Sequence, residues 1–444
     1  MSLSRMQTYQ RRKSSRSTKN RRRFATSLVI AGVVLVGAGV YLSIGHSDIL
    51  SLFHRDAKSA TGLASENPGN SGQEEKNGIA GDREERNATE EQTDAGNETE
   101  EAQEQEAGAN EGTGNDQEGT AGTPLTDEDL VALSFTGDLL PDEYIGDLLK
   151  TQGYDYPYRD ILLYLSEPDV LAGNLETPIT LRGTPMEHEN LEYVYRGSPD
   201  VLPAMASAGF DVFSLANNHA MDQGVEGMLD TKAYLDEAGI GNFGTGSNDV
   251  EAFAPLVKEV RGMKVAYIGV SRVIPFAELK ADRNVPGIAE TYDTTRAVKA
   301  IQKAEEEADI VVVMVHWGKN NEEELEPYQS RFAKEYIDAG ADLVIGSHPH
   351  VLQGFEKYKN RWIAYSLGNF IFSKNPEGKF GETGVLDAHC NKLGECELTF
   401  HPMRVVDAQP VPMEEEEAAV LLDRLSSISY GVRVSADGRL TAEK

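Results

Sequence analysis

The sequence predicts an α/β fold in which short buried strands alternate with amphipathic helices. One observation is a set of five apolar runs, rich in β-branched residues and bounded by Gly, Pro, Asn or helix-like segments. A second is that each run leads directly into Asp, Glu, Asn or His. Sites in open α/β sheets form beyond the carboxyl ends of parallel strands, so these side chains should gather at one edge. The runs with their polar sequels are Val131–Thr136 before Gly137-Asp138, Asp169–Ala172 before Asn174-Leu175-Glu176, Asp211–Leu215 before Asn217-Asn218-His219, Ile310–Val315 before His316-Trp317-Gly318, and Asp342–Ile345 before Ser347-His348-Pro349-His350.

Helix-like spacing of apolar residues separates these runs. Pro199 and Pro327 stand at predicted helix starts, where proline is favoured. Gly209, Gly239 and Gly340 stand where a left-handed helix cap belongs. The predicted helices cover Tyr158–Leu165, Ser198–Ala208, Val225–Ala238, Thr294–Ala308 and Pro327–Ala339.

Two hairpins and a C-terminal group of strands complete the predicted domain. One hairpin joins 256–260 to 264–270 and the other joins 355–358 to 362–367. Residues 383–406 predict further strands, followed by a short helix at 414–427. We place the domain at 127–444, with its ordered part ending near Ser427, which is long enough for a sizeable core.

The N-terminal part predicts a membrane anchor. Residues 1–23 hold nine Lys or Arg and no acid, and residues 24–44 hold no charge. Twenty-one uncharged residues match one transmembrane helix. The basic tail should remain in the cytoplasm, which places the C-terminal domain outside the cell membrane of a single-pass protein. A cleaved signal peptide is the alternative, although no Ala-x-Ala site closes the apolar stretch.

Residues 45–126 predict a disordered acidic linker. From residue 56 to 126 there are eighteen acidic against four basic side chains and few large apolar residues. Self-repulsion would extend this segment as a spacer. The whole chain carries a net charge of −31. Such acidity excludes ordinary nucleic-acid binding, which depends on basic surface, and would repel a polyanion unless cations intervene.

The two cysteines, Cys390 and Cys396, are too far apart for a Cys-x-x-Cys zinc or redox motif. Outside the membrane they favour a small disulfide across a turn, and two free thiols are the alternative.

The polar residues at the strand ends form a predicted metal set. His348 and His350, two apart on an extended segment, should project to the same side, where each could bind one cation of a pair. His316 ends its strand; alone it would be interpreted as a core histidine. Asp138 and Glu176 add carboxylates, although a turn and a solvated acid would explain them singly.

Asn217-Asn218-His219 offers an amide ligand beside a proton donor. A helix N-cap is the simpler interpretation of the asparagines. Asp222 lies three residues after His219 and could orient it. Taken together, the residues favour a centre with two divalent cations, for which Mn, Fe or Zn would suit the N and O ligands.

Six segments resemble the poly-γ-glutamate capsule synthesis proteins of the CapA/PgsA type. That family is similar to the calcineurin-like metallophosphoesterases, which implies a layered β-sandwich flanked by helices and a two-metal centre. The resemblance spans about 131–406 and rests on Phe135-Thr-Gly-Asp138, Asn174-Leu-Glu-Thr-Pro178, Ser214-Leu-Ala-Asn-Asn-His219-Ala-Met-Asp222-Gln-Gly224, His316-Trp-Gly318, Gly340-Ala-Asp-Leu-Val-Ile-Gly-Ser-His-Pro-His350 and Tyr365-Ser-Leu-Gly-Asn-Phe370.

The resemblance also implies roles. Glu176 would bridge the metals, and His219 would be a proton donor and not a ligand. In phosphoesterases of this fold the first ligand motif is commonly Asp-x-His. This chain has the Asp of that motif, in Gly137-Asp138, but not the His, so the first metal would have one histidine ligand fewer. The first metal would bind Asp138 and His350, and the second Asn218, His316 and His348.

Two functions follow from these expectations. The first is a membrane-anchored accessory protein that works beside a membrane-bound polymer synthase complex and contacts the anionic polymer poly-γ-glutamate through its metals. The second is a metal-dependent hydrolase, a phosphoesterase or amidase, acting on a cell-envelope substrate with His219 protonating the leaving group. The same residues serve both, so turnover separates them.

Overall fold

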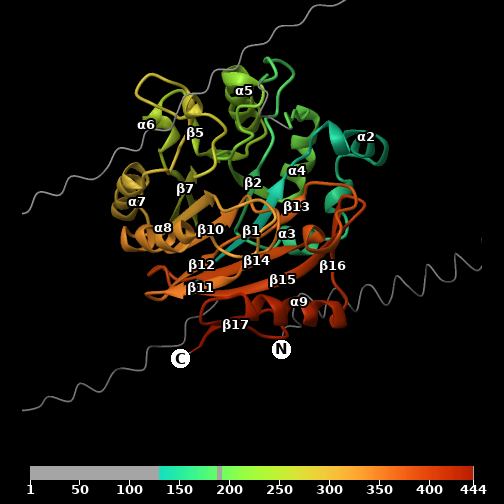
Figure 1. The fold of residues 1–444 in the computed structure, drawn as a ribbon, viewed down its shortest axis with the longest axis vertical. Coiled ribbons are helices and arrows are strands. Elements are labelled where there is room, and N and C mark those ends of the chain that lie inside the picture. Colours follow the sequence, from blue (N-terminus) through green and yellow to red (C-terminus); the bar gives the residue numbers. More distant parts are fainter. Residues whose placement is uncertain (1–129, 188–192, 444) are drawn as a thin grey trace, which may run out of the picture. The chain divides into compact units, whose positions relative to one another are not determined.

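The computed structural model describes residues 130–187 and 193–443 (Figure 1). The expected basic tail, membrane helix and acidic linker lie outside the described residues. Among the residues that are described, no helix combines the length and apolarity needed to cross a bilayer.

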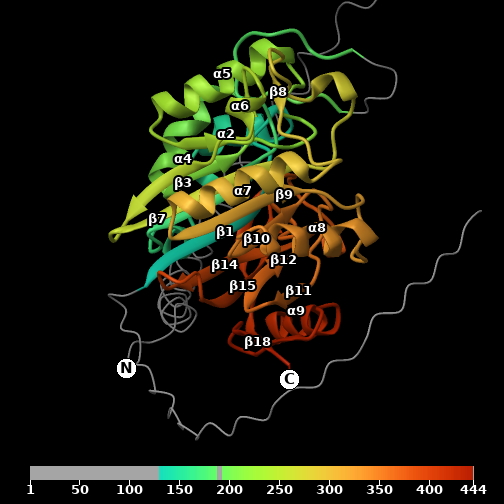
Figure 2. The ribbon, with the colours of Figure 1, turned by 90° about the vertical axis from the view of Figure 1, so that its left-hand side faces the viewer.

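Two mixed β-sheets pack face to face and carry helices on their outer faces, which confirms the predicted α/β class (Figures 1 and 2). In the first sheet the strands β1 to β4 run parallel, and the C-terminal strands β14, β15 and β16 extend it antiparallel. Its order is β16 (Gln409–Pro412), β15 (Cys396–Val406), β14 (Glu382–Cys390), β1 (Val131–Leu139), β2 (Val170–Leu175), β3 (Phe210–Ser214) and β4 (Gly241–Phe243), with β13 (Asn369–Ile371) beside β1.

The second sheet has a parallel centre and an antiparallel strand at each edge. Its order is β11 (Phe355–Tyr358), β12 (Arg361–Ala364), β10 (Leu343–Ser347), β9 (Ile310–His316), β7 (Met263–Ser271) and β6 (Leu256–Val260). All five predicted runs are therefore strands, and both predicted hairpins form. The hairpin turns are shorter than expected because Met263 and Arg361 already pair within the sheet.

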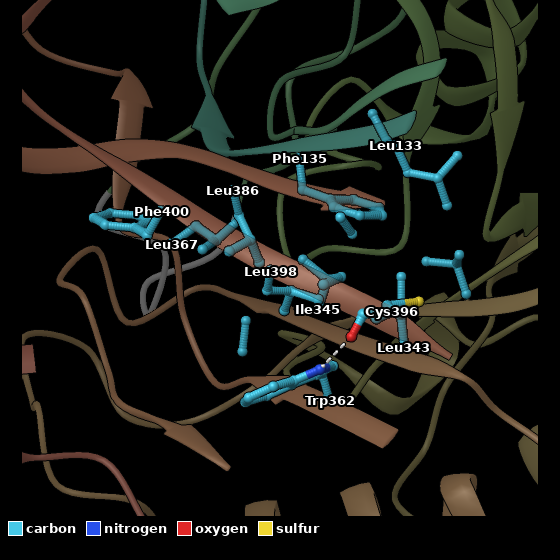
Figure 3. Packing of buried hydrophobic residues seen from close by; sticks show 14 of the residues in the cluster. Leu133, Phe135, Leu343, Ile345, Trp362, Leu367, Leu386, Cys396, Leu398 and Phe400 are labelled. Carbon is cyan, nitrogen blue, oxygen red and sulfur yellow. Dashed lines mark hydrogen bonds between the residues drawn. The ribbon is translucent and has the colours of Figure 1, made fainter. Parts of the chain in front are cut away.

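Apolar side chains from both sheets fill the space between them (Figure 3). Phe135, Val312 and Leu343 are fully buried there, as expected for strands covered on both faces. Trp362 also donates its indole N–H to the carbonyl of Cys396 over 2.9 Å, so this large ring keeps its one polar group satisfied. Cys396 forms the disulfide with Cys390 that joins the ends of β14 and β15, and the two free thiols are ruled out.

The helices cover the outer faces. Most of the predicted helices form, but of Tyr158–Leu165 only Leu162–Leu165 is α-helical, and the helix Glu143–Gln152 was not predicted. Gly209, Gly239 and Gly340 all take left-handed conformations at helix ends. The first sheet carries α2 (Glu143–Gln152), α3 (Leu162–Leu165), α4 (Leu202–Ala208) and α5 (Gly224–Glu237), and the second carries α7 (Thr295–Glu307) and α8 (Pro327–Asp338).

The chain stays in the fold beyond Ser427, where the sequence indicated no further order. After α9 (Glu415–Ser427), β17 (Val432–Val434) pairs with β18 (Leu440–Ala442). Val432 and Leu440 are buried, so this small hairpin closes the end of the core. The remaining short elements of the described residues are α6 (Asp249–Ala252), β5 (Thr245–Gly246), β8 (Gly287–Ile288) and the 3-10 helices η2 (Tyr156–Tyr158), η3 (Pro199–Val201), η4 (Ala277–Leu279) and η5 (Gly378–Gly381).

A bulge in β1 brings Asp138 to the sheet edge. The register of β1 against β2 shifts between Phe135 and Asp138, across Gly137. Asp138 then donates its backbone N–H to the carbonyl of Gly368 over 2.9 Å. A Cβ on Gly137 would lie 1.9 Å from that same oxygen, so only glycine allows this approach.

We predict that Gly137→Ala lowers the free energy of unfolding by about 1–3 kcal/mol, because the added methyl group meets backbone and not a flexible side chain. Gly146→Ala is the matched control: its Cβ would have nothing within 4 Å in the middle of α2, so stability should rise by about 0.5–1 kcal/mol. Urea unfolding measures both. Equal effects of the two substitutions would show that Gly137 is not confined.

Candidate metal centre

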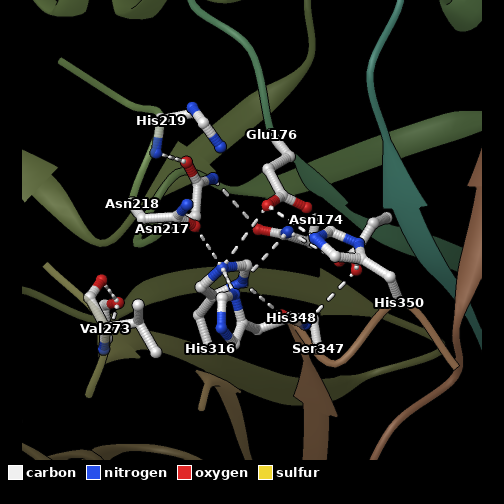
Figure 4. A network of polar contacts seen from close by, with 12 residues as sticks. Asn174, Glu176, Asn217, Asn218, His219, Val273, His316, Ser347, His348 and His350 are labelled. Carbon is white, nitrogen blue, oxygen red and sulfur yellow. Dashed lines mark hydrogen bonds and ion pairs between the residues drawn. The ribbon is translucent and has the colours of Figure 1, made fainter. Parts of the chain in front are cut away.

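The predicted ligands come from the carboxyl ends of five strands, three in the first sheet and two in the second. Asp138 is the last residue but one of β1, and Glu176 follows β2 directly. Asn218 follows β3, His316 ends β9, and His348 and His350 follow β10. Figure 4 shows the side chains of Glu176, Asn218, His316, His348 and His350 gathered around one place. The structure thus brings all six predicted ligands into one polar network.

Two groups of side chains in this network could each hold a metal ion. One group is Glu176, His316 and His348, and the other is Asp138, Glu176 and His350. Within each group the possible ligand atoms lie within 4.8 Å of one another. Glu176 belongs to both groups, which is the geometry required of a bridging carboxylate.

Glu176 gives the clearest sign that the site suits cations. Its side chain is completely buried, and among the described residues neither carboxylate oxygen has a hydrogen-bond partner; Nε2 of His316 and Nε2 of His350 lie 3.5 and 3.8 Å from Oε1. Burial, aided by the charge of Asp138, raises the pKa of Glu176 well above its ordinary value. A buried carboxylate without a partner is costly. A cation on each side would satisfy both oxygens, so the residues present fit two metals.

The two buried histidines fit the same interpretation. Burial, followed by the neighbouring imidazoles, lowers the pKa of His316 and of His348 well below the ordinary value. Both rings are therefore neutral near pH 7, the state in which imidazole binds metals. Nε2 of His316 lies 3.1 Å from Nδ1 of His348, 2.6 Å from Oδ1 of Asn218 and 3.5 Å from Oε1 of Glu176. Four ligand-type atoms converge at this point.

Asp138 is held by two donors that leave one side of it facing His350. Asn174 donates to Oδ1 over 2.8 Å, and the backbone N–H of His348 donates to Oδ2 over 3.2 Å. Nδ1 of His350 lies 3.4 Å from the same Oδ2. Leu140 stands two residues after Asp138, where an Asp-x-His motif would carry its histidine, and it is buried. This group therefore has one imidazole.

His219 lies beside the ligand groups without belonging to either. Its Nδ1 is 2.8 Å from Oδ2 of Asp222, which is itself buried. The same carboxylate oxygen accepts the backbone N–H of Tyr195 over 2.7 Å. The Tyr195 ring packs edge-on against His219, with 4.6 Å between ring centroids. An imidazole held by a carboxylate in this way is oriented for proton transfer from its other nitrogen.

The expectation that His348 and His350 share one side of an extended segment is wrong. Both have positive φ, 98° and 59°, so the backbone turns sharply at each. The tight turn around Pro349 sends the two rings to different ligand groups. They still serve two sites, but through the turn and not through strand alternation.

Sequence reasoning missed the side chains that orient the ligands. Oδ1 of Asn369 lies 2.9 Å from Nδ1 of His350, so Asn369 orients that ring. Oγ of Ser347 lies 2.9 Å from Nδ1 of His316. Asn217 donates to Oδ1 of Asn174 over 3.1 Å and so supports the partner of Asp138. Their only signal in the sequence was proximity to a ligand.

Several known proteins are similar in sequence to this chain. The family model described as bacterial capsule synthesis protein PGA_cap matches residues 132–374. The capsule biosynthesis protein CapA of Bacillus anthracis is 30% identical over 292 residues, covering 65% of this chain and 70% of that protein. The PGA biosynthesis protein CapA of Bacillus subtilis (strain 168) is 28% identical over 330 residues, covering 73% and 86%.

A third relative is a probable polyglutamine synthesis accessory protein of Mycobacterium tuberculosis, 31% identical over 228 residues and covering 49% of this chain and 59% of that protein. Among solved structures, a Thermus thermophilus sulfate thiohydrolase, SoxB, aligns with a TM-score of 0.37 and 13% identity over 69% of this chain and 61% of that one. A 5'-nucleotidase from Candida albicans aligns with a TM-score of 0.34 and 11% identity over 63% and 52%. Scores below 0.5 do not establish a shared fold.

We predict that His348→Ala weakens Mn²⁺ binding at least about tenfold, because it removes a neutral nitrogen from the buried group. His389→Ala, at an exposed histidine on β14, is the matched control and should leave binding unchanged. Isothermal titration with Mn²⁺ measures both. Unchanged affinity in His348→Ala would remove that residue from the ligand set.

Stability of the metal-free protein should depend on pH through Glu176. The folded pKa is raised, so the native chain keeps this proton above pH 4.5 while the unfolded chain releases it. The contribution of Glu176 to the free energy of unfolding is thus fully present at low pH. It is lost as the pH rises through the pKa of Glu176 in the folded chain. The free energy of unfolding of metal-free Glu176→Gln should therefore exceed that of wild type by about 1–3 kcal/mol at pH 8 and match it near pH 4.5.

Urea unfolding in a chelating buffer at several pH values checks this difference. Adding Mn²⁺ at pH 8 should stabilise wild type and not the variant. Parallel pH profiles of the two proteins would contradict an unpaired buried carboxylate.

Proposed function

The chain belongs to the bacterial capsule synthesis protein family PGA_cap, and from this premise we propose that it is an accessory protein of poly-γ-glutamate synthesis. In this proposal the two ligand groups that share Glu176 would hold divalent cations. Bound there, the cations would supply positive charge for carboxylates of the polymer as it is elongated or exported.

The observation that carries the proposal is the completely buried carboxylate of Glu176, shared by two ligand groups and without a hydrogen-bond partner. Neutral imidazoles of His316 and His348 favour a divalent ion on one side, and Asp138 with His350 favours one on the other. Nitrogen and oxygen ligands together suit Mn, Fe or Zn. The sheet-on-sheet architecture with ligands at strand ends supports a calcineurin-like metallophosphoesterase fold for the domain at 127–444.

The negative charges of the protein and of the polymer also support the presence of cations. The chain carries −31, and poly-γ-glutamate is itself a polyanion, so the two would repel each other at long range. Bound divalent ions become the largest local charges in a site. A polymer carboxylate could then reach the strand ends despite the acidity of the surrounding protein.

We also propose that the domain works outside the cell membrane, anchored by residues 24–44 and held off the bilayer by the acidic linker. The disulfide between Cys390 and Cys396 supports an oxidising compartment. The Mycobacterium tuberculosis relative is a probable polyglutamine synthesis accessory protein, which supports the existence of a partner, and a membrane-bound polymer synthase complex is the natural candidate.

A metal-dependent hydrolase is the second candidate, and the pair of His219 and Asp222 favours it. A polymer-binding site alone has no use for an imidazole held by a buried carboxylate. Bound cations would supply Lewis-acid stabilisation of developing negative charge. His219 would protonate the leaving group, and Asp222, held by the Tyr195 amide, would keep its ring in place.

Complementation of a Bacillus subtilis strain lacking its own CapA tests the proposal. We expect wild type to restore poly-γ-glutamate production, and Glu176→Gln to reduce it at least about tenfold through lost metal binding. His219→Ala leaves both ligand groups intact and should keep most of the production. Polymer in the medium is measured, with protein level checked by immunoblot.

Turnover assays of the purified chain with Mn²⁺, Zn²⁺ or Fe²⁺ on phosphoesters and poly-γ-glutamate separate the second candidate. Hydrolysis that disappears together with complementation in His219→Ala would replace the accessory role by an enzymatic one. Full complementation by Glu176→Gln would contradict the metal-dependent proposal.

A further inference from the structure

A cavity opens beyond the same strand ends that supply Asp138 and Glu176. Its volume is about 230 Å³. The walls come from the segments after β1 and β2, from α2, and from the segment before α4. The lining residues are Pro141, Asp142, Gly146, Leu149, Lys150, Tyr154, Thr180, Leu181, Arg196, Gly197, Ser198 and Val201. None of them is a predicted metal ligand.

The cavity lining holds two basic side chains, Lys150 and Arg196, and one acidic side chain, Asp142. Lys150 is largely exposed and lies 3.9 Å from Asp147, and the lining residues Tyr154 and Ser198 hydrogen-bond to Asp200, so Arg196 is the cation of interest. Within the described residues, Arg196 has no carboxylate at ion-pair distance; its guanidinium donates to Oε1 of Gln223 and to the carbonyl of Gly183. A half-buried arginine without a carboxylate can bind an incoming anion through charge-assisted hydrogen bonds.

The rest of the lining suits a short aliphatic chain. Leu149 and Val201 are buried in the wall, and Pro141 lies beside them. The hydroxyl groups of Thr180 and Ser198 in the lining already donate to Asp230 and Asp200. A volume of 230 Å³ is below the range of about 300–1,000 Å³ of sites for drug-sized ligands, so one small unit fits. Apolar walls with cationic side chains match a carboxylate on a few methylene groups.

The cavity and the proton-donor pair share one frame. The side chain of Gln223 donates to the carbonyl of Tyr195 over 2.8 Å and accepts from Arg196. The preceding residue, Asp222, accepts the backbone N–H of Tyr195 and holds His219. Tyr195 and Arg196 therefore form a wall fixed from one side by Asp222 and Gln223, with His219 against Tyr195 and the cavity against Arg196.

We propose that this cavity is a subsite for one carboxylate-bearing aliphatic unit of the substrate, a γ-glutamyl unit if the proposed function holds, and that Arg196 binds its carboxylate. The unit next to it along the same chain then lies at the metal centre. Arg196 acts here as a specificity-determining residue that selects an anionic neighbour.

Titration calorimetry of the full chain loaded with Mn²⁺ tests the subsite, using tri-γ-glutamate, glutarate and inorganic phosphate as probes. Arg196→Gln should weaken tri-γ-glutamate and glutarate binding about tenfold, since it removes a charge-assisted contact. Phosphate binding at the metals should change less than about twofold, because Arg196 contacts no metal ligand. Lys150→Gln, at a largely exposed side chain that cannot disturb the fold, should weaken both carboxylate probes about threefold.

Arg433→Gln on β17 is the matched control, with the same change of charge at an exposed position on the far side of the fold (Figure 1). It should leave all three probes unchanged. Equal tri-γ-glutamate affinity in wild type, Arg196→Gln and Lys150→Gln would overturn the subsite and leave the proposed function standing.

If tri-γ-glutamate does not bind to wild type, the proposed function fails. Glutarate then decides the subsite by itself: an Arg196-dependent affinity supports it, and glutarate affinity that is absent or unchanged in the variant overturns it.

Discussion

The structure depends on one unfavourable group, the carboxylate of Glu176, buried at the point where the two sheets meet. Among the described residues neither of its oxygens has a hydrogen-bond partner, and the charge that acts on it most strongly, that of Asp138, is also negative. A buried carboxylate of this kind persists only if something else compensates for its charge. Divalent cations are the simplest compensation, because neutral imidazoles and an amide oxygen already surround the place where they would bind.

The backbone is strained at the positions that produce this arrangement. The bulge across Gly137 and the positive φ values of His348 and His350 all lie within the strand ends that carry the ligands. Such conformations cost free energy, and they persist where the surrounding packing holds the backbone in place. Here the packing is the doubly covered pair of sheets, whose central strands are buried on both faces. A rigid sandwich thereby holds six side chains that are scattered over more than two hundred positions.

Much of this could be predicted from the sequence, for physical reasons. Buried parallel strands require continuous β-branched runs, so Ile310–His316 was visible, and strand ends had to carry the site. The turn at His348 and His350 could not be predicted, because positive φ in a non-glycine residue has no local signal. Asn369 orients His350 from a separate strand, β13, which is too short for a periodic pattern. The cavity lined by Arg196 could not be predicted either, since its walls come from four separate segments.

The central claim is that cations flank Glu176, and anomalous diffraction from crystals of the Mn²⁺-loaded chain tests it most directly. The account predicts two anomalous peaks, one among Glu176, His316, His348 and Asn218, and one among Glu176, Asp138 and His350. A map with no peak beside Glu176, or with metal bound only elsewhere on the acidic surface, would contradict it.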